Sequence, residues 1–338
     1  MKKKTVIVMT ALFFLLCGAC SGSFGGSGGA NSVGTQASSS PLSGTTEALN
    51  TSITISIYDS QDKSLLEGCY NLIKKYEKMF SRTDPDSEIY ELNDKSEADV
   101  SEETSELIKT GLRYSSESGG RFNIAIEPLT ALWNFSSDKP RVPADAEIKE
   151  AIKHLDYSKI DIRGNHFTLP DKESGIDLGA IAKGYIADKV KEYLLGKGVK
   201  SAIINLGGNV LLVGSKPGGS PFSVGLQDPF ADRNEYKEIV QASDISIVTS
   251  GTYERNFTEN GKTYHHILNP ATGYPYDNGL VAVSIISKTS VEGDALSTSC
   301  FALGLEEGMS FAENQGVHAV FVTSDGEYHY TKDYPYKK

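Results

Sequence analysis

The sequence is poor in cysteine and in positive charge. Only 4 of its 338 residues are cysteines, which excludes a small disulfide-rich protein. Lysine and arginine together number 33 against 44 acidic residues, so the formal net charge is −11. A general nucleic-acid-binding protein needs a cationic surface, and we therefore expect no nucleic-acid partner. Hydrophobic residues still make up 39% of the chain, which is enough for a sizeable folded core.

Several common catalytic motifs are also missing. The sequence contains no Gly-x-x-x-x-Gly-Lys-Ser/Thr phosphate loop, no His-Glu-x-x-His zinc helix and no Gly-x-Ser-x-Gly nucleophile elbow. Any chemistry must therefore come from other local clusters of residues.

The first twenty residues have the layout of an export signal. Three lysines precede an apolar run from Val6 to Cys17, and two small residues lead into Cys20. The run is shorter than the ~20 residues needed to span a bilayer. The segment resembles bacterial lipoprotein signals, although Cys17 stands where an aliphatic residue is usual. We expect cleavage after residue 19 and lipidation of Cys20 on the extracytoplasmic face of a bacterial membrane; simple secretion and an uncleaved anchor are the alternatives.

Glycine, serine, threonine and alanine dominate from Ser21 to about Glu47, with no hydrophobic periodicity. Such a segment buries too little apolar surface to fold. We therefore predict a flexible tether over residues 20–48 and a single domain over residues 49–338. Cys69 and Cys300, each among apolar neighbours, are expected to be buried thiols rather than a disulfide.

Hydrophobic patterns divide the predicted domain into helices and strands. Ile53, Ile55 and Ile57 alternate with polar residues and predict a half-buried strand. Apolar residues spaced by three and four from Leu65 to Phe80 predict a long amphipathic helix. Other helices are expected near residues 103–115, 181–195 and 294–303, with strands near 160–169, 202–226, 281–285, 319–322 and 328–330. Because hairpins dominate the second half, we predict a compact α+β fold with largely antiparallel sheets and packed helices.

Two local clusters could bind a metal ion or an anion. Asp294 and Thr298 are four residues apart on a predicted helix, so a carboxylate and a hydroxyl share one face, which suits Mg²⁺ or Ca²⁺. Asp294 could instead only stabilise the first helical turn. The segment Asp177 to Gly184 leads into a helix with small residues and Lys183, a combination that favours anions. An ordinary strand-to-helix turn would have the same composition.

Three further clusters allow either a functional or a structural interpretation. His265 and His266 are adjacent on a predicted strand, so only one can enter a given site, where it could act as a base. A structural histidine is the alternative. The segment from Ser250 to Arg255 offers backbone donors, an aromatic ring and a guanidinium, or is a decorated hairpin turn. Gly207-Gly208-Asn209 is interpreted as a tight turn, with a ligand contact as the alternative.

Taken in order, these clusters resemble the motifs of the ApbE-type flavin transferases, also known as thiamine-biosynthesis lipoproteins. The resemblance extends from about Leu49 to Phe301 and rests on seven segments. They are Phe80-Ser81 to Ser87-Glu88-Ile89 with Leu92-Asn93; Ser118-Gly119-Gly120-Arg121-Phe122 with Pro128-Leu129 and Leu132-Trp133; Asp177 to Gly184; Asn205-Leu206-Gly207-Gly208-Asn209; Thr249 to Arg255; His266 to Pro270; and Asp294 to Thr298.

The resemblance implies a fold, a reaction and a set of site residues. It implies a compact α+β body that uses FAD and Mg²⁺ to transfer FMN to a Thr or Ser hydroxyl of a partner flavoprotein, releasing AMP. The expected acceptors are flavoproteins of extracytoplasmic redox systems. The implied metal ligands are the Ala180 carbonyl, Asp294 and Thr298, and the implied catalytic residues are His266 and Asp294. The implied FAD contacts are Leu49, Thr83, Arg121, Phe122, Asn123, Asp177, Lys183, His266 and Ile267.

The sequence departs from the family pattern at a few positions. Thr83 stands where an aromatic residue often covers the flavin or the adenine, and Asn123 and Asn269 stand where Asp is usual. Leu49-Asn50-Thr51 replaces the usual Met-Gly-Thr. Ser43-Gly44-Thr45-Thr46 is loosely similar to the Ser/Thr-Gly-x-Ser/Thr acceptor core but lacks the upstream Asp, and we interpret it as part of the tether.

Two other functions remain compatible with the same motifs. One is an FAD pyrophosphatase, in which water replaces the acceptor hydroxyl and the products are FMN and AMP. The other is a lipid-anchored flavin-binding protein without turnover. The Asp294 and Thr298 pair favours catalysis, because flavin binding alone needs no such pair.

Overall fold

An antiparallel sheet of eight strands forms the frame of the part of the chain described by the computed structural model, residues 40–232 and 235–336. The strand order is β1-β2-β6-β7-β10-β13-β14-β15, and every neighbouring pair is antiparallel. The strands are β1 (Leu42–Ala48), β2 (Thr51–Ile57), β6 (Ser201–Leu206), β7 (Asn209–Gly214), β10 (Ser246–Gly251), β13 (Leu280–Ser287), β14 (His318–Thr323) and β15 (Tyr328–Tyr330).

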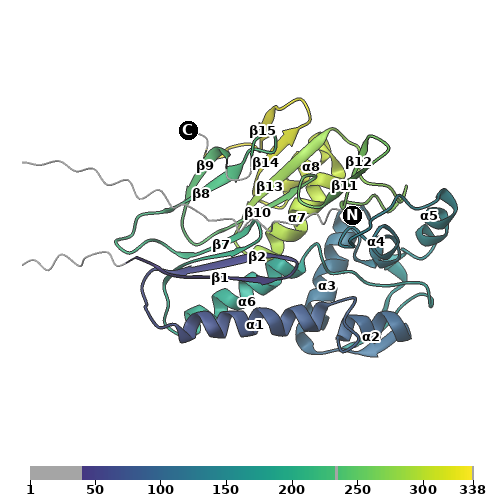
Figure 1. Cartoon of the computed structure of the whole chain (residues 1–338), viewed down its shortest axis with the longest axis horizontal. Helices are drawn as coiled ribbons and strands as arrows, with labels where there is room; N and C mark the ends of the chain where they lie inside the picture. The colour runs from purple at the N-terminus through teal and green to yellow at the C-terminus, as the bar shows by residue number, and fades with distance from the viewer. Residues whose placement is uncertain (1–39, 233–234, 337–338) are drawn as a thin grey trace, which may run out of the picture.

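Helices cover one face of this sheet. Helices α1 and α6 run beneath β1 and β2, and α7 and α8 pack beneath β10, β13 and β14 (Figure 1). Helices α2 to α5 lie beyond the end of α1. The helices are α1 (Ser64–Phe80), α2 (Glu88–Lys95), α3 (Glu102–Glu117), α4 (Glu127–Trp133), α5 (Asp145–Ile152), α6 (Ala182–Gly196), α7 (Ser290–Leu303) and α8 (Leu305–Asn314), with short 3-10 turns at Ile124–Ile126 and Tyr157–Lys159.

Smaller sheets complete the structure. The hairpin of β8 and β9 covers the face of the main sheet opposite the helices (Figure 1). The remaining strands form a three-stranded sheet and a second hairpin. These strands are β3 (Glu97–Asp99), β4 (Asp161–Arg163), β5 (His166–Thr168), β8 (Phe222–Gln227), β9 (Tyr236–Ala242), β11 (Asn256–Glu259) and β12 (Lys262–His265).

Both faces of the central strands of the main sheet are buried. Leu211 belongs to the hydrophobic cluster between the sheet and the helices, whereas the next residue, Leu212, belongs to the cluster between the sheet and the β8–β9 hairpin. Successive side chains of a strand point to opposite faces, so this split is expected of a strand buried on both sides. Strand β2 buries Ile53, Ile55 and Ile57 completely in the helix-side cluster. The central strands are therefore held from two directions.

The predicted α+β class and the principal predicted elements are confirmed. The periodicity from Leu65 to Phe80 becomes α1, and the alternating isoleucines lie in β2. Cys69 and Cys300 are buried free thiols, as expected. Within the described residues, no helix has both the length and the apolar character required to cross a bilayer.

The predicted tether is wrong for residues 42–48. These residues form β1, which pairs along its whole length with β2, and Leu42 and Ala48 are buried. The segment Ser43-Gly44-Thr45-Thr46 is part of this strand, and the Ser43 hydroxyl donates to Ser56 across the pair. Strand pairing supplies the stabilisation that the local composition lacks. The signal segment, Cys20 and residues 20–39 of the predicted tether lie outside the described residues.

Helices α6 and α7 approach each other closely at Gly184. A Cβ at this position would lie 2.3 Å from the Ser290 carbonyl oxygen and 2.6 Å from the Val291 Cα. Both are backbone atoms, so neither can rotate away. Glycine at position 184 is therefore required for the observed contact between the two helices.

We expect Gly184→Ala to destabilise the protein by about 1–3 kcal/mol, because the added methyl group must push the two helices apart. The gain in helix propensity of about 1 kcal/mol offsets only part of this cost. Gly196→Ala is the matched control, since it lies in the same helix with nothing within 4 Å of its added Cβ. Urea unfolding of the full chain would contradict the prediction if the two variants were equally stable.

Candidate functional site

The junction of α6 and α7 joins two of the predicted metal-site segments. Asp294 on α7 is only 4% exposed, and its Oδ2 accepts a hydrogen bond of 2.8 Å from the Gly184 N–H. Gly184 lies in the first turn of α6, where a backbone N–H has no partner within the helix, so the bond to Asp294 satisfies this donor. Ala180 precedes the helix, and no backbone donor among the described residues bonds to its carbonyl. A carbonyl without a donor can serve as a ligand.

Thr298 lies one turn further along α7 and meets the end of β10. Its Oγ1 is 3.1 Å from the Ser250 hydroxyl, which is also 2.8 Å from the Ser297 hydroxyl. The Ser297 hydroxyl in turn donates to the Asp294 carbonyl. Strand β10 thus orients the face of α7 that carries both predicted ligands. Sequence reasoning singled out the segment from Ser250 to Arg255 but did not assign Ser250 this role.

The oxygen atoms at this junction fit a hard divalent cation. Burial raises the pKa of Asp294, and the positive charge of Lys183 opposes that rise. Among the described side chains, no cation comes within ion-pair distance of Asp294. A buried carboxylate without a close counter-ion is costly, and a bound cation would compensate for it. One carboxylate with neutral oxygens suits Mg²⁺, which retains waters and binds substrate phosphates. The described residues contain no group of three or more His, Cys, Asp or Glu that could hold a metal.

The two adjacent histidines have different hydrogen-bonding roles. His265 uses both ring nitrogens: Nε2 donates to the Tyr276 carbonyl at 2.9 Å, and Nδ1 accepts from the Ile267 N–H at 3.3 Å. His266 places Nδ1 3.2 Å from the Arg255 carbonyl oxygen. A carbonyl only accepts, so Nδ1 carries the proton and Nε2 keeps its lone pair. Of the two, His266 is the one suited to accept a proton.

His266 is neutral in the ligand-free protein. Burial, together with the positive charges of Arg255, His265 and Lys183, lowers its pKa to about 3. Lys183 therefore acts electrostatically on both His266 and Asp294. The start of α6 therefore lies close enough to both His266 and Asp294 for the charge of Lys183 to act on each.

Tyr276 connects the histidine segment to the predicted flavin contacts. Its hydroxyl donates to the Arg121 carbonyl at 2.9 Å, and its N–H donates to the Ile267 carbonyl at 3.0 Å. Phe122 and Ile267 are both buried. Tyr276 was missed by sequence reasoning, because its two partners lie far apart in the sequence and no local spacing marks it.

Arg82 is a second residue that sequence reasoning missed. Its Nε lies 3.1 Å from the Asp177 carboxylate and its Nη1 lies 3.5 Å from that of Glu127. Asp177 also accepts from the Thr130 hydroxyl at 2.7 Å. Burial raises the pKa of Glu127, and Arg82 opposes that rise. Asp177, a predicted FAD contact, is thus part of a half-buried charge cluster. Thr83, another predicted contact, follows Arg82 in the sequence and lies beside this cluster.

The remaining predicted FAD contacts are less directly connected to the predicted metal site. Leu49 lies in the β1–β2 turn, where its N–H donates to Glu77 at 2.5 Å. Arg121 and Thr83 expose their side chains. Asn123 uses its amide within the protein, donating to the Leu155 carbonyl and accepting from the Ala125 N–H, both at 2.8 Å.

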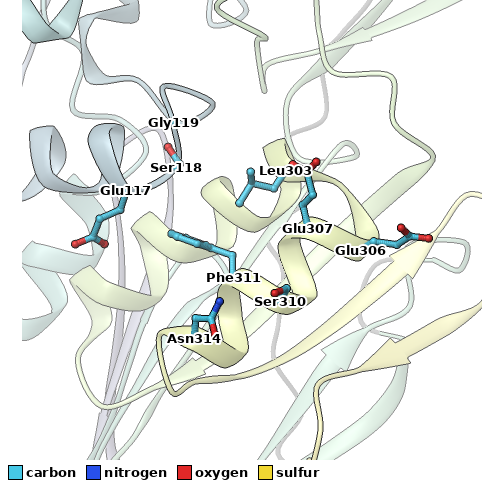
Figure 2. Close-up of a pocket in the computed structure, with 9 residues that line it drawn as sticks. All are labelled: Glu117, Ser118, Gly119, Leu303, Glu306, Glu307, Ser310, Phe311 and Asn314. Carbon is cyan, nitrogen blue, oxygen red and sulfur yellow. The ribbon is translucent and has the colours of Figure 1, made fainter.

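A separate pocket lies between the end of α3 and the α7–α8 corner. Figure 2 shows Glu117, Ser118 and Gly119 on one side of it and the side chains of α8 with Leu303 on the other. Its volume is about 550 Å³, and Glu306 and Glu307 also line it. Three glutamates would repel a pyrophosphate. The pocket contains none of the predicted metal ligands.

Comparisons with known proteins identify the family of the chain. The model of the ApbE family matches residues 49–321. An FAD:protein FMN transferase from Klebsiella pneumoniae (strain 342) is 36% identical over 272 residues, covering 79% of this chain and 84% of that protein. Another with the same name, from Treponema pallidum (strain Nichols), is 34% identical, covering 77% of each chain. The crystal structure of an ApbE protein from Thermotoga maritima superimposes with a TM-score of 0.82 at 30% identity, covering 88% of this chain and all of that one. The chain therefore belongs to the ApbE family.

Proposed function

We propose that this chain is an FAD:protein FMN transferase that moves FMN from FAD to a Thr or Ser hydroxyl of a partner flavoprotein, in a Mg²⁺-dependent reaction that releases AMP. The observation that carries the proposal is the α6–α7 junction, where the Gly184 N–H bonds to buried Asp294 and the Ala180 carbonyl, just before α6, has no backbone donor among the described residues. Two relatives that are 34% and 36% identical bear the name of this activity.

Asp294, Thr298 and the Ala180 carbonyl would hold the Mg²⁺. The ion would neutralise charge on the FAD pyrophosphate and orient the phosphorus of the FMN half. Lys183 acts on the same region and would add positive charge for the pyrophosphate. These residues therefore bind and orient the group that is transferred.

His266 would take the proton from the acceptor hydroxyl. The acceptor oxygen bonds to the FMN-side phosphorus while the bond from that phosphorus to the AMP oxygen breaks, so AMP leaves with the electron pair. In the ligand-free protein, burial and nearby positive charges hold the pKa of His266 at about 3, which keeps its Nε2 unprotonated. The negative charge of a bound pyrophosphate would offset those positive charges and raise the proton affinity of His266 toward a useful range.

The decisive experiment measures the mass of an acceptor protein and the nucleotide products together. The full chain is mixed with FAD, Mg²⁺ and an acceptor domain that carries the Ser/Thr-Gly-x-Ser/Thr acceptor core. The acceptor domain is one that a second family member is known to modify. A mass gain equal to FMN minus water, with stoichiometric AMP and loss of both on adding EDTA, supports the transferase. FMN and AMP without a mass gain would indicate a pyrophosphatase, and intact bound FAD would indicate a flavin-binding protein.

We expect Asp294→Asn to reduce transfer by about 100-fold or more. The variant lacks the carboxylate charge that would hold Mg²⁺, and the ion would stabilise charge in the transition state by several kcal/mol. The amide keeps an acceptor for Gly184 and removes a buried charge, so the thermal midpoint should stay the same or rise. Glu292→Gln, on the same helix, is the matched control and should keep full activity. Comparable activity in the two variants would contradict the assignment of Asp294.

The lowered pKa of His266 predicts a pH dependence of stability. Between its folded value of about 3 and its ordinary value of 6.5, the unfolded chain binds a proton on this residue that the folded chain does not. Stability from this group is therefore lost as the pH falls from 6.5 toward 3. In urea titrations, we expect the free energy of unfolding of the wild type, relative to that of His266→Asn, to decrease as the pH falls from 6.5 toward 3. A constant difference would show that His266 has an ordinary pKa.

We also propose that the chain is exported and anchored through a lipid on Cys20, on the extracytoplasmic face of a bacterial membrane where acceptor flavoproteins of redox systems lie. The support is the sequence of the first twenty residues. We expect a Cys20→Ser variant to leave the membrane fraction and to lose labelling by radioactive palmitate. Membrane association that persists in this variant, without label in either protein, would favour an uncleaved anchor.

A further inference from the structure

The first turn of α7 is capped by a residue from another helix. Thr289 stands at the N-cap of α7, but its side chain forms no capping hydrogen bond. Asp188 on α6 takes this role instead: its Oδ1 accepts from the Ser290 N–H at 2.8 Å, and its Oδ2 accepts from the Val291 N–H at 2.9 Å. The carboxylate thus satisfies two unpaired donors and balances the positive end of the helix.

This cap is one of two polar contacts between α6 and α7. The other is the bond from the Gly184 N–H to Asp294. Gly184 and Asp188 are one turn apart on α6, and Ser290 and Asp294 are one turn apart on α7. The contacts run in opposite order along the two helices, so they fix an antiparallel register. A slip of either helix by one turn, about 5.4 Å, would break both contacts.

The cap has an energetic cost that a neutral residue would avoid. Burial raises the pKa of Asp188 to about 6, while its bonds to Ser290 and Val291 and the charge of Lys191 act in the opposite sense. Serine or asparagine caps a helix well without such a cost. A carboxylate, however, offers two acceptor oxygens and can hold two successive N–H groups at once. The Asp188 carboxylate therefore holds the first turn of α7 more firmly than a cap with one acceptor oxygen would.

We propose that Asp188 is a positioning residue for the metal site, holding the first turn of α7 against α6 so that Asp294 and Thr298 keep a fixed register with the Ala180 carbonyl. This inference rests on the proposed function, since it concerns the site that would hold Mg²⁺. Asp188 acts through α7 and is not itself a ligand. Its loss changes the spacing between the Ala180 carbonyl, just before α6, and the two ligands on α7, while leaving each ligand in the chain.

The test compares metal binding with stability in Asp188→Ala, Asp188→Asn and a control. Asp62→Asn is the matched control, because Asp62 accepts from the Ser64 N–H at the start of α1, another helix N-terminus. Calorimetric titration of Mg²⁺ into the full chain gives its Kd. Assays of FMN transfer give the Mg²⁺ concentration for half-maximal rate and the KM for FAD.

We expect Asp188→Ala to raise the Mg²⁺ Kd by about 10-fold or more, as loss of an orienting partner typically does. Asp188→Asn, which keeps one acceptor oxygen, should fall between Asp188→Ala and the wild type. The KM for FAD at saturating Mg²⁺ should change less than twofold. If Asp188→Ala does not fold, Asp188→Asn provides the same comparison.

Two results would overturn the inference in different ways. An Asp188 variant that loses thermal stability but keeps the wild-type Mg²⁺ Kd and rate would show that the cap is only structural. A wild-type chain that binds no Mg²⁺ and transfers no FMN would refute the proposed function, and with it this role for Asp188. Unchanged Mg²⁺ binding in Asp62→Asn is required for the effect to be specific to α7.

Discussion

The hydrogen bond from the Gly184 N–H to Asp294 is the interaction on which the rest of the site depends. It requires two helix backbones in direct contact, which only glycine allows at position 184. It satisfies a first-turn N–H that has no partner within α6, and it gives the buried Asp294 carboxylate one donor. The junction thus combines a carboxylate without a close cation, on α7, with the Ala180 carbonyl just before α6, which has no backbone donor among the described residues. Both are conditions for cation binding.

Hydrogen bonding also distinguishes the two adjacent histidines. His265 is buried with both ring nitrogens engaged, so it joins the end of β12 to the segment at Tyr276 and has no lone pair left for chemistry. His266 has one nitrogen bonded to the Arg255 carbonyl, and the surrounding positive charge lowers its pKa. Positive charge that lowers the pKa of a ligand-free histidine is also charge that binds an anion. In the proposed function, binding of the pyrophosphate would therefore be coupled to the proton affinity of His266.

Much of the fold could be predicted because its principal elements carry their own hydrophobic period. The isoleucines of β2 alternate, and the apolar residues of α1 recur every three or four positions. Strand β1 could not be predicted, because Leu42–Ala48 is mostly small and polar and becomes a strand only by pairing with β2. Of the candidate site, the Asp294 and Thr298 pair was visible as helical spacing. Arg82 and Tyr276 were not, since their partners are set by tertiary structure.

The departures from the family pattern lie outside the α6–α7 junction, and one of them has a structural explanation. Asn123 donates to the Leu155 carbonyl and accepts from the Ala125 N–H, and an ionised Asp could only accept. The amide is thus fitted to join two loops in this chain. Beside Thr83, Arg82 holds Asp177 and Glu127 together. The chain therefore varies in the shell where FAD is expected to lie, while Gly184, Asp188, Asp294 and Thr298 keep the geometry of the junction. Substrate affinity can change in such an arrangement without altering the register of the two helices.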